Sequence, residues 1–446
     1  MSAQGSQPLP SRKATGPLDL DQQSALTAHV LTSHTRLPAL ADPQALYALV
    51  SVSLRADAAL DPLPLNLCLV IDHSTSMQGP RQQAVQVATR RIVDRLRPND
   101  SLSLVVFNDR AEVLLPARRN VDKAMVKAAL SVVQPAGGTE LLQGLGAGMR
   151  EVVRGRTKTS LNYVVVLTDG RTYGDEAGCL ELAKWAGGHQ IHITAMGIGD
   201  DWNEDLLDEV AHLSGGRVFY IGNAQRVPEI LDDAIRYLTR VAARQTTLQA
   251  AAAPGAILRE AFLVAPEVRR LTVGEGQPPV WLGPLGVGER QLVLLEYHIE
   301  AVPPGLQPIA SLRIEADIPG QPGDVASATA DVMVELVPRS ETGSIGRISS
   351  ADIPTAIPNA LARVALLRMH EKVGAELAAG LTDSATQRLE AMAVRLSAMG
   401  ETELARSAML EAGQLARTGM LSPEGRKRMR YGTRALSLTT HGEHDD

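Results

Sequence analysis

The chain of 446 residues exceeds the size of one ordinary domain, because single hydrophobic cores stop growing at about 250 to 300 residues. Hydrophobic residues make up 44% and charged residues 21%, a composition that excludes a wholly disordered protein. The net charge of -6 excludes a global attraction to nucleic acid or anionic lipid, so any basic contact must be local. We therefore expect a globular protein of about two or three domains.

The sequence shows no sign of export or of membrane insertion. Its first residues lack the apolar core of a signal peptide, and no stretch reaches the roughly 18 apolar residues that a membrane span requires. We therefore expect a cytoplasmic protein without a membrane span. Cys68 and Cys179 lie in apolar segments, which predicts buried thiols and no disulfide framework or cysteine zinc site.

The N-terminal part changes character twice. Residues 1–20 are rich in Ser, Gln, Pro and Gly and have no periodicity, which predicts a disordered lead. Residues 21–64 contain two β-type segments without helices between them. From residue 65 to residue 242, short apolar strands alternate with amphipathic helices. Such strands need cover on both faces, so we predict a doubly wound α/β domain with a parallel sheet.

Residues 243–338 lose the helical period and contain about five short strand-like runs separated by Pro and Gly turns. Together with the two segments of residues 21–64, they predict one antiparallel β-sandwich. The segments of residues 21–64 lack the crossover helices that parallel pairing with the α/β sheet would need. We therefore predict that the α/β domain is inserted into a β-sandwich built from both flanks.

The C-terminal part is predicted to be helical. Residues 339–352 have the composition of a linker, and residues 353–435 place apolar side chains at helical spacing. Each of three glycines ends a predicted helix, and a Ser-Pro dipeptide opens a fourth helix with Ser as N-cap and Pro at the first helical position. The glycines are Gly380, Gly400 and Gly419, and the dipeptide is Ser422-Pro423. Residues 436–446 are expected to form a frayed tail.

Five side chains that carry oxygen donors follow predicted strand ends of the α/β domain. They are Asp72, Ser74, Ser76, Thr139 and Asp169. The first three stand two residues apart after the first strand, Thr139 follows a Gly-Gly pair, and Asp169 ends a later strand. In an open α/β sheet, ligands bind at the carboxyl ends of the strands, where these side chains would meet. Hard oxygen donors suit Mg²⁺, Mn²⁺ or Ca²⁺ better than zinc.

The ordered pattern D-x-S-x-S, then G-G-T, then T-D-G resembles the metal-ion-dependent adhesion site (MIDAS) of von Willebrand factor A (VWA) domains, without a substitution. The resemblance covers about residues 65–238. It implies that Ser74, Ser76 and Thr139 ligate Mg²⁺ (or Mn²⁺ or Ca²⁺) through their hydroxyls. It also implies that Asp72 and Asp169 act largely through bound waters. Taken singly, each residue also has a structural explanation, as an N-cap, a strand-end acid or a turn former.

The resemblance implies a non-enzymatic module that captures an Asp or Glu carboxylate of a partner protein at the metal. The sequence contains no phosphate-binding G-x-x-x-x-G-K-[ST] loop, no H-E-x-x-H helix and no G-x-S-x-G elbow. The alternative hypothesis is an accessory subunit of a chelatase-like or MoxR-type machine, in which the AAA+ ATPase is a separate chain. A secreted adhesin is disfavoured, and the Ala, Leu and Arg bias favours a bacterial-type intracellular protein.

Other polar features have structural explanations. His73 is expected to point away from the metal loop, and His189 and His192 are expected to be structural histidines. The acidic residues between 200 and 209 are predicted to form a solvated helix start. The basic residues between 426 and 434 are predicted to form a solvated helix face, with contact to an acidic partner as the alternative.

Overall fold

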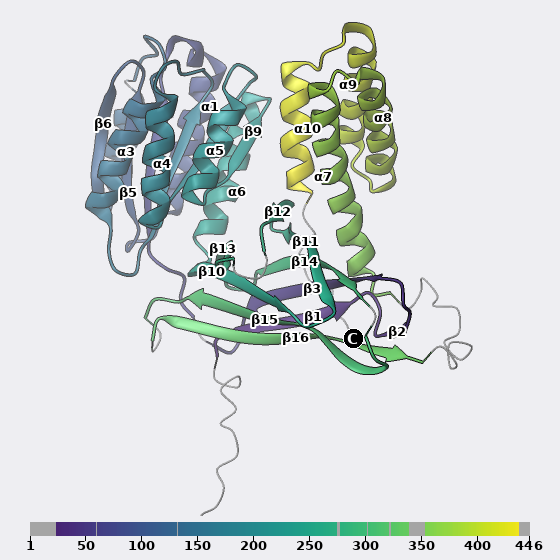
Figure 1. The fold of residues 1–446 in the computed structure, drawn as a ribbon. Helices are drawn as coiled ribbons and strands as arrows, with labels where there is room; N and C mark the ends of the chain where they lie inside the picture. The colour runs from purple at the N-terminus through teal and green to yellow at the C-terminus, as the bar shows by residue number, and fades with distance from the viewer. Residues whose placement is uncertain are drawn as a thin grey trace, which may run out of the picture.

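The computed structural model describes residues 24–58, 60–131, 133–273, 277–300, 302–320, 323–338 and 353–436. The predicted lead, the predicted linker and the predicted tail beyond residue 436 lie outside the described residues. Figure 1 shows an α/β body and a helical bundle side by side, with a β body below both.

The α/β body is built on a six-stranded sheet with the order β6-β5-β4-β7-β8-β9. Its strands are β4 (Leu65–Asp72), β5 (Ser101–Phe107), β6 (Ala111–Arg119), β7 (Leu161–Thr168), β8 (Ile191–Ile198) and β9 (Val218–Ile221). All neighbouring strands pair in parallel except β6, which pairs antiparallel with β5. The doubly wound sheet predicted from the sequence is confirmed, but β6 was not predicted. Its sequence contains Pro116, which an edge strand with register shifts tolerates.

Helices cover both faces of this sheet. They are α1 (Pro80–Arg95), α2 (Lys123–Ser131), α3 (Leu141–Gly155), α4 (Glu176–Gly188), α5 (Glu204–Ser214) and α6 (Val227–Leu238), with short 3₁₀ helices η2 (Thr75–Met77) and η3 (Ala224–Arg226). One core packs α3, α4 and α5 against alternate residues of the strands, and the other packs α1, α2 and α6. Cys68 and Cys179 are free buried thiols in the first of these cores.

The β body consists of two five-stranded sheets with the orders β1-β3-β14-β11-β12 and β13-β10-β15-β16-β2. The strands are β1 (Leu26–Thr32), β2 (Arg36–Pro38), β3 (Gln44–Leu54), β10 (Val241–Ala252), β11 (Ala256–Ala265), β12 (Arg269–Leu271), β13 (Val280–Gly286), β14 (Arg290–Ile299), β15 (Gly305–Asp317) and β16 (Val325–Val337). β3 pairs with both β1 and β14, and β2 pairs in parallel with β16. Strands from both flanks of the α/β body therefore share both sheets and one core.

The C-terminal side of the β body has more strands than the sequence indicated. Among the described residues, seven strands, β10 to β16, lie after the α/β body, whereas about five were expected. β10 begins directly after α6, and β13 contains three non-β-forming positions, Gly283, Pro284 and Gly286, which hide it from a propensity argument.

The two chain crossings between the β body and the α/β body lie side by side. The backbone N–H of Leu63, just before β4, donates to the carbonyl oxygen of Val241 at the start of β10, at 2.7 Å. The chain therefore leaves the β body and returns to it at one point.

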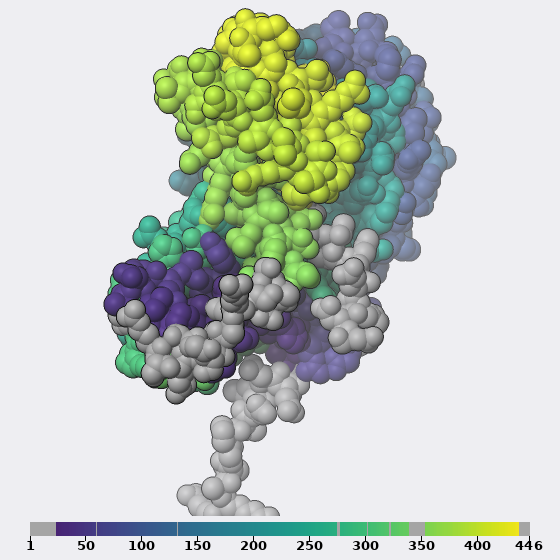
Figure 2. Space-filling model, turned by 90° about the vertical axis from the view of Figure 1, so that its right-hand side faces the viewer, coloured from purple at the N-terminus to yellow at the C-terminus, as the bar shows by residue number. Residues whose placement is uncertain are grey.

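The helical bundle comprises α7 (Ala356–Ala378), α8 (Thr382–Ala398), α9 (Thr402–Thr418) and α10 (Pro423–Ala435), as predicted. The Ser422 hydroxyl accepts a hydrogen bond from the N–H of Gly425 at 2.8 Å, so Ser422 is the predicted N-cap of α10. The bundle shares a core with the outer face of the first sheet, where Phe262 and Leu294 pack in one cluster with Val364 of α7. In Figure 2 the bundle, in green and yellow, lies against the teal and blue α/β body.

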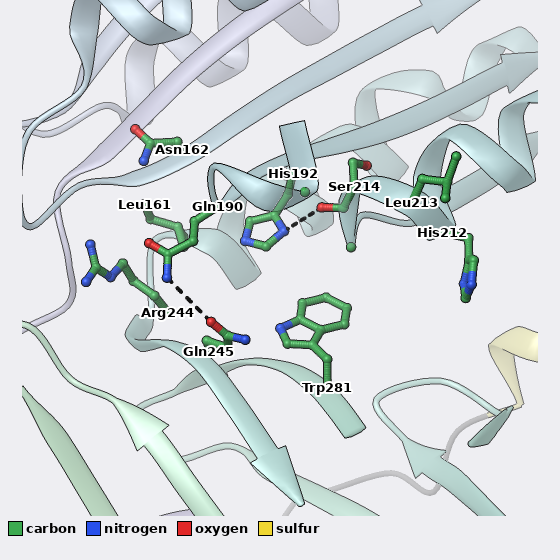
Figure 3. A pocket seen from close by; sticks show the side chains of 12 residues that line it. Leu161, Asn162, Gln190, His192, His212, Leu213, Ser214, Arg244, Gln245 and Trp281 are labelled. Atoms are coloured by element: carbon green, nitrogen blue, oxygen red, sulfur yellow. Dashed lines mark hydrogen bonds between the residues drawn. The ribbon is translucent and has the colours of Figure 1, made fainter. Parts of the chain in front are cut away.

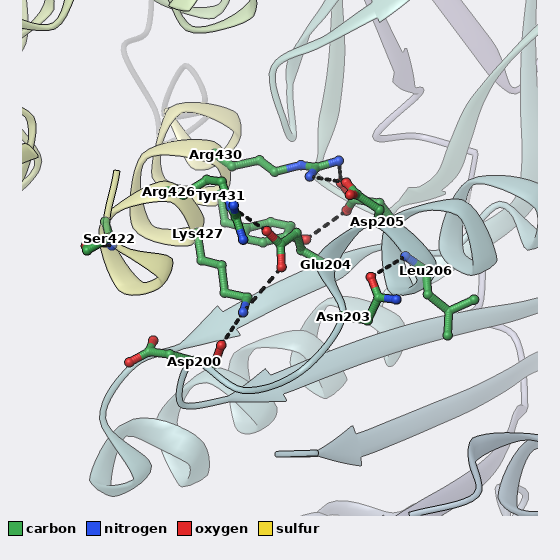
Figure 4. Close-up of polar contacts among 12 residues, drawn as sticks. Asp200, Asn203, Glu204, Asp205, Leu206, Ser422, Arg426, Lys427, Arg430 and Tyr431 are labelled. Atoms are coloured by element: carbon green, nitrogen blue, oxygen red, sulfur yellow. Dashed lines mark hydrogen bonds and ion pairs between the residues drawn. The ribbon is translucent and has the colours of Figure 1, made fainter. Parts of the chain in front are cut away.

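Charge pairing joins α10 to the α/β body. The acidic residues at the start of α5 are Glu204, Asp205 and Asp208, and the basic residues of α10 that meet them are Arg426, Lys427, Arg430 and Arg434. Figure 4 shows most of these side chains pointing toward one another. The acidic cluster was predicted to be a solvated helix start and the basic cluster a solvated helix face. Both predictions are wrong for Glu204 and Lys427, which are buried, whereas Asp205 keeps an exposed side chain. Each cluster neutralises the other across more than 200 residues of sequence, a separation that no local pattern reveals.

The centre of this contact is Lys427, whose side chain is 0% exposed. Its ammonium group lies 3.3 Å from Oε2 of Glu204, donates to the carbonyl oxygen of Asp200 and sits 4.8 Å from the centre of the Trp202 ring. Asp208 accepts hydrogen bonds from Arg434 at 2.9 Å and from the Tyr431 hydroxyl at 3.1 Å. Each buried charge therefore has partners, which a lysine out of water requires.

We predict that a fragment of residues 239–338 will not fold cooperatively, because it lacks β3, the strand that pairs with β1 and β14. The matched control joins residues 24–63 directly to residues 241–338 through a short Gly-Ser linker, which the Leu63–Val241 hydrogen bond makes feasible. Thermal melts followed by circular dichroism measure both fragments. Cooperative melting of the first fragment, or its absence in the second, contradicts the shared β body.

We predict that Lys427→Met lowers the free energy of unfolding by about 3 kcal/mol, because Glu204 keeps a buried charge after losing one of its two cations. The control is Arg428→Met on the same helix, whose ion pair with Glu424 is exposed and should contribute less than about 1 kcal/mol. Urea denaturation compares the two variants. Equal losses for the two variants count against a stabilising contact between α10 and α5.

Candidate metal centre

The predicted donors converge because their strands are neighbours. Asp72 is the last residue of β4, and Asp169 directly follows β7. These two strands pair in parallel in the middle of the sheet, with Ile71 opposite Leu167, so their carboxyl ends share one edge. Ser74 and Ser76 follow Asp72 in the turn that η2 closes.

Hydrogen bonds connect four of the five predicted residues. Oδ1 of Asp72 accepts from the backbone N–H of Ser74 at 2.8 Å. The hydroxyls of Ser74 and Ser76 are 3.0 Å apart, and the Ser76 hydroxyl donates to Oδ1 of Asp169 at 2.7 Å. The sequence motif thus forms one continuous polar chain from β4 to β7.

The fifth donor, Thr139, stands at the same edge. A Cβ built on Gly170 would lie 2.7 Å from Oγ1 of Thr139, so the threonine hydroxyl faces the residue after Asp169 and leaves no room for a side chain there. The Gly-Gly loop before Thr139 is fixed to the serine loop, since the Gly137 carbonyl accepts from the backbone N–H of Thr75 at 3.2 Å and from its hydroxyl at 3.0 Å. All five predicted donors are therefore brought together.

The two carboxylates are buried and close to one another. Asp72 is 1% exposed and Asp169 is 0% exposed. Burial raises the pKa of Asp72, the charge of Asp169 adds to that effect, and hydrogen bonds from Thr168 and Ser74 oppose it. Two adjacent buried anions are costly without a cation, so the electrostatics favour positive charge at this edge.

Two residues missed by the sequence argument contact these carboxylates. The Thr168 hydroxyl donates to Oδ2 of Asp72 at 2.6 Å and holds that carboxylate in place. The guanidinium of Arg81, in the first turn of α1, forms an ion pair with Oδ2 of Asp169 and donates to the Ser76 carbonyl at 3.3 Å. Thr168 lies inside the T-D-G motif, whereas Arg81 had no signal, because it is one of several cations on an amphipathic helix.

The histidines lie outside the centre, as expected. Nδ1 of His73 is 3.3 Å from the carbonyl oxygen of Gln134, and Nδ1 of His189 is 2.7 Å from that of Trp185. His192 is buried, which lowers its pKa to about 4 and keeps it neutral. The described residues contain no group of three or more His, Cys, Asp or Glu side chains that could hold a metal, so a metal site among them must also use other donors, such as hydroxyls.

A cavity lies at the opposite end of the sheet. It has a volume of about 250 Å³ and lies between the starts of β7 and β8 and the strands β10 and β13. Figure 3 shows His192 above Trp281 on its wall, with their rings stacked at a centroid distance of 5.6 Å. Gln190 and Gln245 bridge the two bodies at 3.4 Å. The cavity therefore belongs to the joint between the bodies and is distinct from the metal centre.

The donor set fits a hard divalent cation. Two carboxylates and three hydroxyls supply only oxygen, the ligand type that Mg²⁺, Mn²⁺ and Ca²⁺ prefer. The set contains no thiolate or imidazole, so it is a poor match for a structural zinc site. The donor set lies at the carboxyl edge of a doubly wound sheet, and this combination of fold and site indicates the domain family of the α/β body.

Residues 66–233 match the von Willebrand factor type A domain, and residues 355–439 match the Sll0103-like, C-terminal alpha-helical domain. The chain therefore contains a VWA domain followed by a helical domain of this second type. Among the described residues, none of the helices is long and apolar enough to span a membrane.

Two bacterial proteins are similar to this chain in sequence. The chain is 31% identical over 276 residues to "Uncharacterized protein sll0103" of Synechocystis sp., covering 60% of this chain and 66% of that protein. It is 24% identical over 250 residues to "Uncharacterized protein YfbK" of Escherichia coli, covering 54% of this chain and 43% of that one. Both relatives are bacterial, and the chain spans less than two thirds of the length of either.

A solved structure resembles nearly the whole chain. The von Willebrand factor type A protein from Catenulispora acidiphila superposes with a TM-score of 0.71 at 16% identity, covering 93% of this chain and 98% of that one. At this identity the likeness concerns the fold alone.

Proposed function

We propose that this chain is a non-enzymatic, cytoplasmic binding protein that holds a divalent cation, Mg²⁺ by preference, and captures a partner through an Asp or Glu carboxylate. The observation that carries the proposal is the polar chain from Asp72 through Ser74 and Ser76 to Asp169. It supplies hydroxyl and carboxylate donors at the ligand-binding edge of the sheet.

The roles of the side chains follow from their charge and position. Ser74, Ser76 and Thr139 would ligate the ion directly through neutral hydroxyls, while Asp72 and Asp169 would balance its charge, in part through water. A bound divalent ion offers a partner carboxylate a coordination position that water otherwise fills. Because the direct ligands are neutral, the ion's attraction for an incoming anion is left largely intact.

We also propose that the β body acts as one frame for the VWA domain. Its predicted limits are residues 21–64 and 243–338, on either side of a VWA domain of residues 65–242, but β10 begins at Val241, two residues before the predicted boundary. The shared sheets and the adjacent chain crossings support this division. The helical domain, residues 353–435, packs on both the frame and α5 and offers a further docking surface.

We predict that Ser76→Ala weakens Mg²⁺ or Mn²⁺ binding by about tenfold or more, because it removes one direct ligand. Ser327→Ala is the matched control, since its exposed side chain lies on β16 of the β body, away from the metal centre. Calorimetric titration should show near wild-type affinity for the control and no binding for Asp72→Ala. Unchanged binding in both Ser76→Ala and Asp72→Ala would place the ion elsewhere.

We predict that partner retention on the immobilised protein requires the ion and is competed by free acetate, which occupies the carboxylate position. Retention from an extract of the native cells is compared in Mg²⁺, in EDTA and in Mg²⁺ with excess acetate, with Ser76→Ala as a further arm. Retention that survives EDTA contradicts capture through the metal. If the retained partner is an ATPase and its retention requires ATP, the result supports the accessory-subunit hypothesis instead.

A further inference from the structure

An internal cation already occupies part of the candidate metal centre. Arg81 forms an ion pair with Oδ2 of Asp169, the carboxylate whose other oxygen accepts from the Ser76 hydroxyl. The Asp169 side chain is 0% exposed, whereas that of Arg81 is 32% exposed. The pair thus joins a buried anion to a partly exposed cation.

The position of Arg81 is constrained on its other sides. Its guanidinium donates to the Ser76 carbonyl at 3.3 Å, and a Cβ built on Gly199 would lie 2.8 Å from Nη2. The guanidinium therefore lies between the serine loop and the end of β8, next to the donors. Glycine at residue 199, where φ is +72°, leaves this space free.

The net charge of the three ionisable groups indicates that Arg81 disfavours monovalent ions at the metal centre. Asp72, Asp169 and Arg81 together carry one negative charge when all are ionised, whereas the two carboxylates alone carry two. A monovalent ion that displaced Arg81 from Asp169 would exchange one positive charge for another and gain little Coulomb energy. A divalent ion brings a second charge and gains from the exchange.

We propose that Arg81 is the internal counter-cation of Asp169. By pairing with this carboxylate, Arg81 raises the concentration of divalent ion needed to fill the metal centre and excludes monovalent ions from it. This inference rests on the proposed function and adds a selectivity residue to that site. Arg81 acts through Asp169, so it is a positioning residue and not a ligand.

The test measures ion binding directly, with Mn²⁺ as the probe and calorimetry as the readout. Arg81→Gln should bind Mn²⁺ about five- to tenfold more tightly than the wild type, because Mn²⁺ no longer has to break the partly buried ion pair between Arg81 and Asp169. Arg81→Lys keeps the charge and should stay near the wild type. The matched control is Arg171→Gln at the same edge, because Arg171 donates to the uncharged Asp201 carbonyl at 3.0 Å.

A second arm tests selectivity. Titrations in KCl and in tetramethylammonium chloride at equal ionic strength separate K⁺ competition from screening. K⁺ should weaken Mn²⁺ binding in Arg81→Gln and have little effect on the wild type. A melting curve confirms the fold of each variant, and the Arg81 side-chain N–H signal of the wild type should shift on addition of Mg²⁺, which tests the pair without a substitution.

The outcomes separate this inference from the proposed function. If the wild type binds Mn²⁺, Asp72→Ala does not, and Arg81→Gln binds no more tightly than the wild type, the role of Arg81 is overturned and the metal centre stands. If the wild type binds no Mn²⁺, both are overturned. If Arg81→Gln and Arg171→Gln increase the Mn²⁺ affinity equally, the effect comes from the loss of any nearby positive charge. The specific role of Arg81 is then also overturned.

Discussion

The parallel pairing of β4 with β7 is the constraint on which the candidate metal centre depends. It places Asp72 and Asp169 at adjacent strand ends inside a sheet whose central strands are buried on both faces. The ladder fixes the backbone at both strand ends, so the fold keeps the two carboxylates near one another. Hydroxyl donors from Thr168 and Ser76 and the guanidinium of Arg81 offset their mutual repulsion.

The loops around the centre depend on this pairing in turn. The serine loop and the Gly-Gly loop are hydrogen-bonded through Thr75 and Gly137, so they hold Thr139 near the residue that follows Asp169. The loop after β8 borders the same edge, because Asp201 accepts from Arg171 and Gly199 adjoins Arg81. A ligand at this edge would therefore contact loops from several strands, which is how open α/β sheets build their sites.

Buried charge also organises the molecule at a larger scale. Lys427 of α10 reaches the Asp200 carbonyl and Glu204, at the loop that leads from β8 into α5. The helical domain is thus anchored one loop away from the proposed metal centre, while its other face packs on the β body. Because a buried lysine requires its partners, this arrangement fixes how the helical domain is oriented on the VWA domain.

The sequence by itself determined the features that are local in the chain. Periodicity identified the α/β body and the four C-terminal helices. The strand-end motifs predicted that Asp72, Ser74, Ser76, Thr139 and Asp169 lie at one edge, because strand topology dictates where such residues meet. Only the tertiary structure decided that Arg81 pairs with Asp169 and that the acidic start of α5 pairs with α10. The strands β6 and β13 were also hidden, since Pro and Gly positions mask strands that pairing alone defines. A sequence does not distinguish a charged side chain that stays exposed on an amphipathic helix from one that is buried against a partner. Only the packing of the helices decides which charges are buried and paired.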